Sequence, residues 1–225
     1  MKNNIELKTI MTKKITLTIA LLLFFAMARA QNSQKAKTLL DEVYTQVIGY
    51  DNIMIDFKYV LENTEANTKS ETRGNATLMG DKYRVELFGS TQLFDGQKVY
   101  TIIPENEEVT IEDGSSDEET ITPSKMLTFY REGHNYEWDI MQNVKGRKIQ
   151  YVKLTPIDSD AEIKTILLGI DAETKHIYRL IETGNNGTKT TITVNSFKTD
   201  QPLSKSLFTF NTAKYEDDGY YIIKN

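Results

Sequence analysis

Few side chains in this 225-residue chain have the type and spacing that catalysis or metal binding requires. The chain has no cysteine, which excludes thiolate chemistry and disulfide bonds. Its two histidines, His134 and His176, lack a second histidine at metal-binding spacing, and no nucleophile elbow, Walker loop or dinucleotide fingerprint occurs. We therefore predict that the protein is not an enzyme and has no metal site or cofactor, with His134 at a helix end and His176 in a surface hairpin.

An acidic run is the second candidate for chemistry, with eight carboxylates between Glu105 and Glu119. It lacks the alternating ligands and the central glycine of a calcium loop. A solvated loop is favoured over a metal or partner site.

The more informative side chains are apolar and aromatic, and several lie on consecutive predicted strands. Each could be ordinary core, but a curved sheet closed by a short helix can also leave a hollow for an acyl chain. The residues predicted to line that hollow are Ile55, Phe57, Tyr59, Leu78, Tyr83, Val85, Leu87, Tyr100 and Ile102. A helix predicted over Pro123–Arg131 would act as its lid, with Met126, Leu127, Phe129 and Tyr130 facing the hollow.

The elements that must position these residues are mostly strands. A first helix is predicted from an N-cap at Ser33 to a stop at Gly49, with one apolar stripe formed by Ala36, Leu39, Leu40, Val43 and Val47. The period then changes to two, and short strands with turn residues between them continue to a last strand at residues 207–210 and a polar tail. The predicted strands are 53–61, 74–79, 83–88, three short pieces within 93–111, 149–154, 163–170, 176–183 and 189–197, with a polar turn region at 63–72. This pattern predicts a mainly β, barrel-like fold in a single domain.

The N-terminus indicates export. Two lysines precede the apolar run from Ile15 to Met27, and Ala28-Arg29-Ala30 then supplies the small residues that a signal peptidase needs. Residues 1–30 are therefore predicted to be a signal peptide cleaved before Gln31, whether translation starts at Met1 or at Met11. Of the 27 basic and 32 acidic residues, five basic and one acidic lie in that segment. The mature chain, residues 31–225, therefore has 22 basic and 31 acidic residues, a formal charge of −9. This charge argues against nucleic acid as a partner and against docking on anionic lipid.

The order of several segments resembles the outer-membrane lipoprotein carrier family (LolA-like proteins). The segments that carry the resemblance are Leu78–Leu87, Phe94-Asp95-Gly96, Tyr100–Pro104, the Pro123–Phe129 helix, Tyr151–Pro156, Gly187–Val194 and Phe208–Phe210. The resemblance implies an incomplete antiparallel β-barrel with an α-helical lid over a hydrophobic cavity. It also implies a soluble, monomeric periplasmic carrier that takes acylated lipoproteins from an inner-membrane ABC transporter and delivers them to a receptor at the outer membrane.

One departure from the family pattern concerns the lid. Family members often carry an Arg-Pro pair in the turn before the aromatic strand, whereas this turn reads Gly80-Asp81-Lys82 and the nearest arginine is Arg84. We therefore expect a different lid latch or none. The alternative functions are a periplasmic lipid or glycolipid carrier and a lipoprotein-sensing envelope regulator of the same fold.

Overall fold

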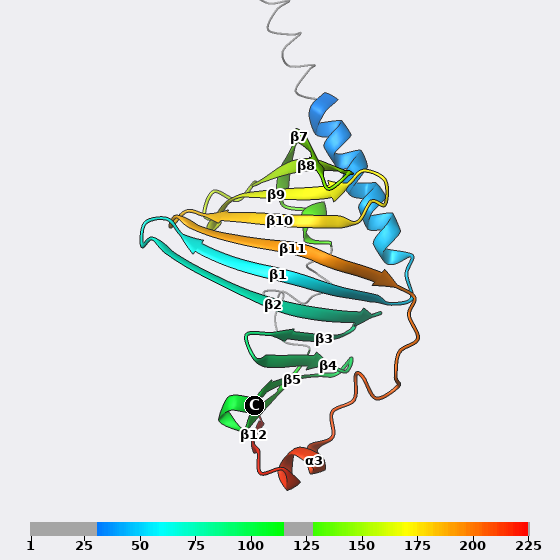
Figure 1. The fold of residues 1–225 in the computed structure, drawn as a ribbon, viewed down its shortest axis with the longest axis vertical. Helices are drawn as coiled ribbons and strands as arrows, with labels where there is room; N and C mark the ends of the chain where they lie inside the picture. The colour runs from blue at the N-terminus through cyan, green and yellow to red at the C-terminus, as the bar shows by residue number, and fades with distance from the viewer. Residues whose placement is uncertain (1–30, 115–127, 225) are drawn as a thin grey trace, which may run out of the picture.

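The computed structural model describes residues 31–114 and 128–224, which form one curved sheet with a long helix beside it (Figure 1). The twelve strands follow the order β12-β6-β5-β4-β3-β2-β1-β11-β10-β9-β8-β7. Neighbours are antiparallel, except that β12 runs parallel to β6. Within the described residues the outer strands β7 and β12 do not pair with each other, so the sheet stays open. The predicted incomplete antiparallel barrel is confirmed.

The elements have the following bounds. The strands are β1 Ile53–Asn63, β2 Thr68–Met79, β3 Lys82–Leu87, β4 Ser90–Phe94, β5 Lys98–Ile103, β6 Glu108–Asp113, β7 His134–Val144, β8 Arg147–Pro156, β9 Ile163–Asp171, β10 Ile177–Gly184, β11 Thr188–Thr199 and β12 Tyr221–Lys224. The helical segments are residues 31–48, the 3₁₀ turns η1 Pro104–Asn106 and η2 Phe129–Arg131, and α3 Thr212–Asp217.

The N-terminal helix (residues 31–48) packs with the face that the sequence predicts. All five residues of its apolar stripe are buried, and they join the main core. Residue 31 is already helical, so Ser33 lies inside the helix and the predicted N-cap is wrong. The predicted end is confirmed, because residue 48 is the last helical residue and the Gly49 amide closes a turn on the Gln46 carbonyl.

The β1–β2 hairpin is longer than predicted, and most of the expected turn region 63–72 is strand. Only residues 64–67 separate the two strands, and the Asn63 side chain accepts hydrogen bonds from the Glu65 and Ala66 amides there. The polar residues in this outer part of the hairpin stabilise it by pairing across the strands. Lys69 and Glu62, for example, form an ion pair at 2.6 Å.

Three predictions near the ends of the described segments need correction. Residues 134–144, which were not predicted as a strand, form the edge strand β7, and His134 begins that strand instead of ending a helix. The predicted strand at 207–210 is absent, and the last strand is β12 in the supposed polar tail. The sequence of β7 does carry a period-two signal, since Tyr136 and Trp138 alternate with polar residues and pack on the main core, and this signal was missed. Strand β12 has only four residues, too few to show a period. Of the predicted 123–131 helix, residues 129–131 are a 3₁₀ turn and residues 123–127 lie outside the described residues.

The sheet has two cores, one on each face. The main core lies between the N-terminal helix and the inner face of the sheet, and includes Leu78, Leu154 and Leu168. The second core covers the opposite face of β4 to β6, where Leu93, Tyr100, Ile102, Val109 and Ile111 pack against Phe208 from the C-terminal segment. Paired residues share a face, and Tyr100 pairs with both Leu93 and Ile111, so these side chains must point the same way.

Candidate functional site

An apolar cavity of about 260 Å³ lies beside the main core, on the inner face of the sheet. Five strands contribute to its wall, and Gln92 on β4 adds a polar side chain. The lining residues are Ile55, Phe57, Tyr59, Ala76, Leu78, Val85, Leu87, Gln92, Ile177, Leu180, Ile192, Val194 and Phe197. Many of these pack directly against the buried core under the helix. The cavity is therefore a part of the inner face that the helix leaves uncovered.

Strand register explains why these residues meet. Tyr59 pairs with Ile192 on β11, and Ile192 pairs with Leu180 on β10. On the other side, Ile55 pairs with Ala76, and Ala76 pairs with Val85. Because paired residues project to one face, alternate residues of five adjacent strands form a continuous apolar wall.

Gly74 shapes the floor of the cavity. It pairs with Phe57, whose ring lies so close that a Cβ atom at position 74 would stand 2.6 Å from the ring. A side chain here would push the Phe57 ring out of its place. The glycine therefore permits the close approach of an aromatic ring to the backbone of β2.

The rim carries an exposed aromatic residue, Phe88, in the turn between β3 and β4. Its ring packs edge-on against Tyr59 with centroids 5.2 Å apart, while 59% of the residue stays exposed. Its backbone has φ +53°, which a phenylalanine rarely adopts. The Phe88 ring therefore extends the apolar surface of Tyr59, a lining residue, toward solvent.

Six of the nine predicted cavity residues line this cavity, namely Ile55, Phe57, Tyr59, Leu78, Val85 and Leu87. The other three lie elsewhere. Tyr83 is on the same face but is 1% exposed in the main core, where burial raises the pKa of its hydroxyl. Tyr100 and Ile102 belong to the second core on the opposite face. Their placement in the cavity was wrong. Alternation shows which residues of one strand share a face, but it does not show which of the two faces of the sheet they point to.

Sequence reasoning missed seven cavity residues, most of them on β10 and β11. These are Ala76, Gln92, Ile177, Leu180, Ile192, Val194 and Phe197. Strand β11 was predicted, and its alternation of threonine with apolar residues marked an apolar face. What the sequence lacked was the pairing of β1 with β11, two strands far apart in the chain.

The predicted lid is only partly within the described residues. Met126 and Leu127 lie outside them, whereas Phe129 is partly buried and Tyr130 is fully buried in the main core. Burial raises the pKa of the Tyr130 hydroxyl. The next residue, Arg131, lies over the Tyr44 ring of the N-terminal helix at 3.7 Å. The described end of this segment is therefore packed onto the helix.

The N-terminal helix is anchored at its C-terminal end beside the cavity. Tyr50 Oη lies 2.7 Å from His176 Nε2 and accepts a hydrogen bond from Gln46. The His176 ring stacks on Phe197, a cavity residue, with centroids 4.1 Å apart. His176 is thus half-buried and not the surface residue that was predicted, and burial lowers the pKa of its imidazole.

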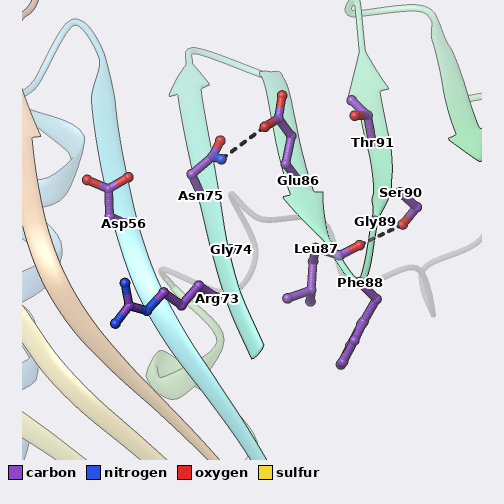
Figure 2. A pocket seen from close by; sticks show the side chains of 10 residues that line it. All are labelled: Asp56, Arg73, Gly74, Asn75, Glu86, Leu87, Phe88, Gly89, Ser90 and Thr91. Atoms are coloured by element: carbon purple, nitrogen blue, oxygen red, sulfur yellow. Dashed lines mark hydrogen bonds between the residues drawn. The ribbon is translucent and has the colours of Figure 1, made fainter. Parts of the chain in front are cut away.

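A second hollow of about 390 Å³ opens on the other face of β1 to β3 and is polar (Figure 2). Asn75 donates to Glu86 in it, and Glu86 also accepts two hydrogen bonds from Arg84. Asp56 and Arg73 face the same hollow from β1 and β2. Its central carboxylate is already satisfied by neighbouring side chains, which is typical of a solvated sheet surface.

The described residues hold neither a cluster of metal ligands nor a membrane-spanning helix. Among residues 31–114 and 128–224, no three His, Asp or Glu side chains come together as metal ligands. In the same segments no helix is long and apolar enough to cross a membrane. Part of the acidic run, residues 115–119, lies outside the described segments.

Comparison with known proteins identifies a family. The model of the family described as outer membrane lipoprotein carrier protein LolA matches residues 50–211. No curated protein matches the chain.

Several solved structures are similar at low sequence identity. An uncharacterized conserved protein from Thermus thermophilus has a TM-score of 0.53 and 8% identity, covering 85% of this chain and 99% of that one. LprF from Mycobacterium bovis has a TM-score of 0.46 and 12% identity, covering 77% and 98%. A putative outer membrane lipoprotein-sorting protein domain from Vibrio parahaemolyticus has a TM-score of 0.44 and 10% identity, covering 79% and 97%. At these identities, the Thermus structure shows a shared fold and nothing more.

Proposed function

This chain belongs to the LolA family of outer membrane lipoprotein carrier proteins, and we propose that it carries acylated cargo in the apolar cavity on the inner face of its sheet. The cargo is the acyl part of lipoproteins, which the protein moves through the periplasm from the inner to the outer membrane. An inner-membrane ABC transporter loads it and an outer-membrane receptor unloads it. The protein works as a monomer without enzymatic activity, after cleavage of residues 1–30.

The observation that carries the proposal is the cavity itself. Its wall is almost entirely apolar, and nearby core residues have already been desolvated by the helix, so an acyl chain placed there would exchange water for apolar contacts. Its volume of about 260 Å³ lies near the lower end of ligand pockets, roughly 300–1,000 Å³. In this conformation it has room for a single chain segment, so a cargo with several acyl chains requires the cavity to widen.

A matched pair of substitutions on β11 tests the use of the cavity. Ile192 lines it, whereas Thr191 is its neighbour on the opposite face, and both are half-buried. We expect Ile192→Trp to fill the cavity and weaken binding of a neutral fluorescent acyl probe at least tenfold. Thr191→Trp should bind the probe like the unmodified protein. Circular dichroism of both variants confirms that they are folded.

Equal binding by both tryptophan variants, in folded protein, would mean that the acyl chain does not enter this cavity and would overturn the proposal.

The identity of the cargo separates the main proposal from its alternatives. Mass spectrometry of the protein purified from the periplasm should find diacylated or triacylated lipoproteins bound to it. Free lipids or glycolipids would instead indicate a lipid carrier, and a stoichiometric regulatory protein would indicate an envelope sensor. N-terminal sequencing of the same sample should begin at Gln31.

A further inference from the structure

The acidic side chain of Glu182 faces the same side of the sheet as the cavity. It lies on β10 two residues after Leu180, a lining residue, and therefore on the same face. Its cross-strand partners are Ile166 on β9 and Thr190 on β11. Glu182 thus occupies the position next to the cavity along the strand, toward the end where β10 turns into β11.

The five strands that form the cavity wall place no other charged residue on the cavity side. In the described register of β1, β2, β3, β10 and β11, every other position on the cavity side is apolar, glycine or an uncharged polar residue. No described residue forms a hydrogen bond or an ion pair with the Glu182 side chain. Two other strand glutamates differ, since Glu62 pairs with Lys69 and Glu86 pairs with Arg84.

An unpartnered, half-buried carboxylate costs stability, because it loses water without gaining a replacement hydrogen bond. Burial accordingly raises the pKa of the Glu182 carboxyl. A ligand that brings a hydrogen-bond donor to this position would satisfy the carboxylate when it binds. A ligand with its own carboxylate at this position would meet a like charge in a partly desolvated place.

We propose that Glu182 binds the polar end of the acyl ligand and selects head groups that present an N–H donor over head groups that are anionic. This inference rests on the proposed function and sharpens it. The ligand class it specifies is an acyl chain whose first polar group is an amide or an amine, and it disfavours a free fatty acid. Glu182 is then a specificity-determining residue in a site that is otherwise apolar.

Three ligands with the same twelve-carbon chain test the proposal. They are N-methyldodecanamide, which is neutral with an N–H donor, dodecylamine, which is cationic, and dodecanoate, which is anionic. Each competes with diphenylhexatriene, a neutral probe without polar atoms, on the mature protein at pH 7. We expect the amide and the amine to compete about tenfold better than dodecanoate, which corresponds to about 1.4 kcal/mol.

The Glu182→Gln variant should reverse the preference of the site for cationic dodecylamine over anionic dodecanoate. Dodecanoate should gain about tenfold and dodecylamine should lose about tenfold, while the amide changes less than about threefold because glutamine still accepts a hydrogen bond. Glu162→Gln is the matched control. It removes the same charge from an exposed position just before β9, near the same end of the sheet, and should leave all three affinities unchanged.

Two outcomes separate this proposal from the one it rests on. If diphenylhexatriene does not bind to the unmodified protein, the cavity is not a ligand site and both proposals fail. If the probe binds but Glu182→Gln and Glu162→Gln give the same ligand preferences, only the role of Glu182 is overturned. A thermal midpoint raised by about 1–4 °C in Glu182→Gln alone would support the role, because removing an unsatisfied charge stabilises the empty protein.

Discussion

The two apolar surfaces of this sheet have similar composition but different covers. On the outer face of β4 to β6, the chain's own C-terminal segment fills the surface, and Phe210 stacks on Tyr100 with centroids 4.4 Å apart. On the inner face, the N-terminal helix covers one part and leaves a cavity over β1 to β3, β10 and β11. An apolar strand face therefore becomes core or remains an open cavity according to whether another part of the same chain reaches it.

The largest expected effect is a loss of unfolding free energy in the second core, which the C-terminal segment fills. Phe208 is 4% exposed in the second core, so Phe208→Ala should leave a cavity and cost about 3–5 kcal/mol of unfolding free energy. Phe57→Ala, in the cavity wall, should cost about 1–2 kcal/mol, because that ring is only half-buried. Urea unfolding of both variants measures the difference. Similar losses in the two would contradict the division into a core and a binding surface.

The next effect concerns the floor of the cavity. Gly74→Val should cost about 1–3 kcal/mol and abolish acyl-probe binding, because the new Cβ displaces the Phe57 ring into the cavity. The double variant Gly74→Val/Phe57→Ala provides the control, since it removes the ring that would clash. It should recover part of the probe binding. If the double variant binds no better than Gly74→Val, the Phe57 ring is not the group that matters. The clash would then be with the Glu86 carbonyl oxygen, which would lie 2.7 Å from the same Cβ.

Sequence patterns predicted the parts of this fold that depend on local chemistry. The stripe Ala36 to Val47 gave the buried helix face, and Gly49 gave the end of that helix. The alternation in β1 gave the cavity residues Ile55, Phe57 and Tyr59. In each case the signal lies within a few residues of sequence.

What could not be predicted depends on pairing between distant segments. Strand β1 pairs with β11 through Tyr59 and Ile192, and no local pattern specifies that partner. Tyr100 was assigned to the wrong face for the same reason, since only its cover by Phe208 and Phe210 shows which side of the sheet it occupies. The location of the cavity is therefore a property of the tertiary fold.

The smallest expected effect concerns His176, which joins the helix-covered part of the inner face to the open part. Tyr50 Oη accepts a hydrogen bond from Gln46, so its own proton is available for His176 Nε2, which accepts it only when that nitrogen is unprotonated. Burial lowers the pKa of His176 in the folded state; nearby Asp171 raises it and Arg147 lowers it further. The unfolded chain therefore binds a proton first as the pH falls below about 6.5, and stability is lost from there downward.

Replacing the imidazole should remove this part of the pH dependence. Between pH 7.5 and pH 5.5, the unmodified protein should lose more unfolding free energy in urea than His176→Phe, which keeps a ring stacked on Phe197. The difference should stay under about 1 kcal/mol, because the side chain is half-exposed and solvent screens its charge. Tyr50→Phe serves as the control: it deletes the hydrogen bond to Nε2 but keeps the titrating ring, so its pH dependence should persist. An identical loss in His176→Phe and the unmodified protein would show that His176 binds protons equally in both states, and that the junction between covered and open surfaces does not respond to pH.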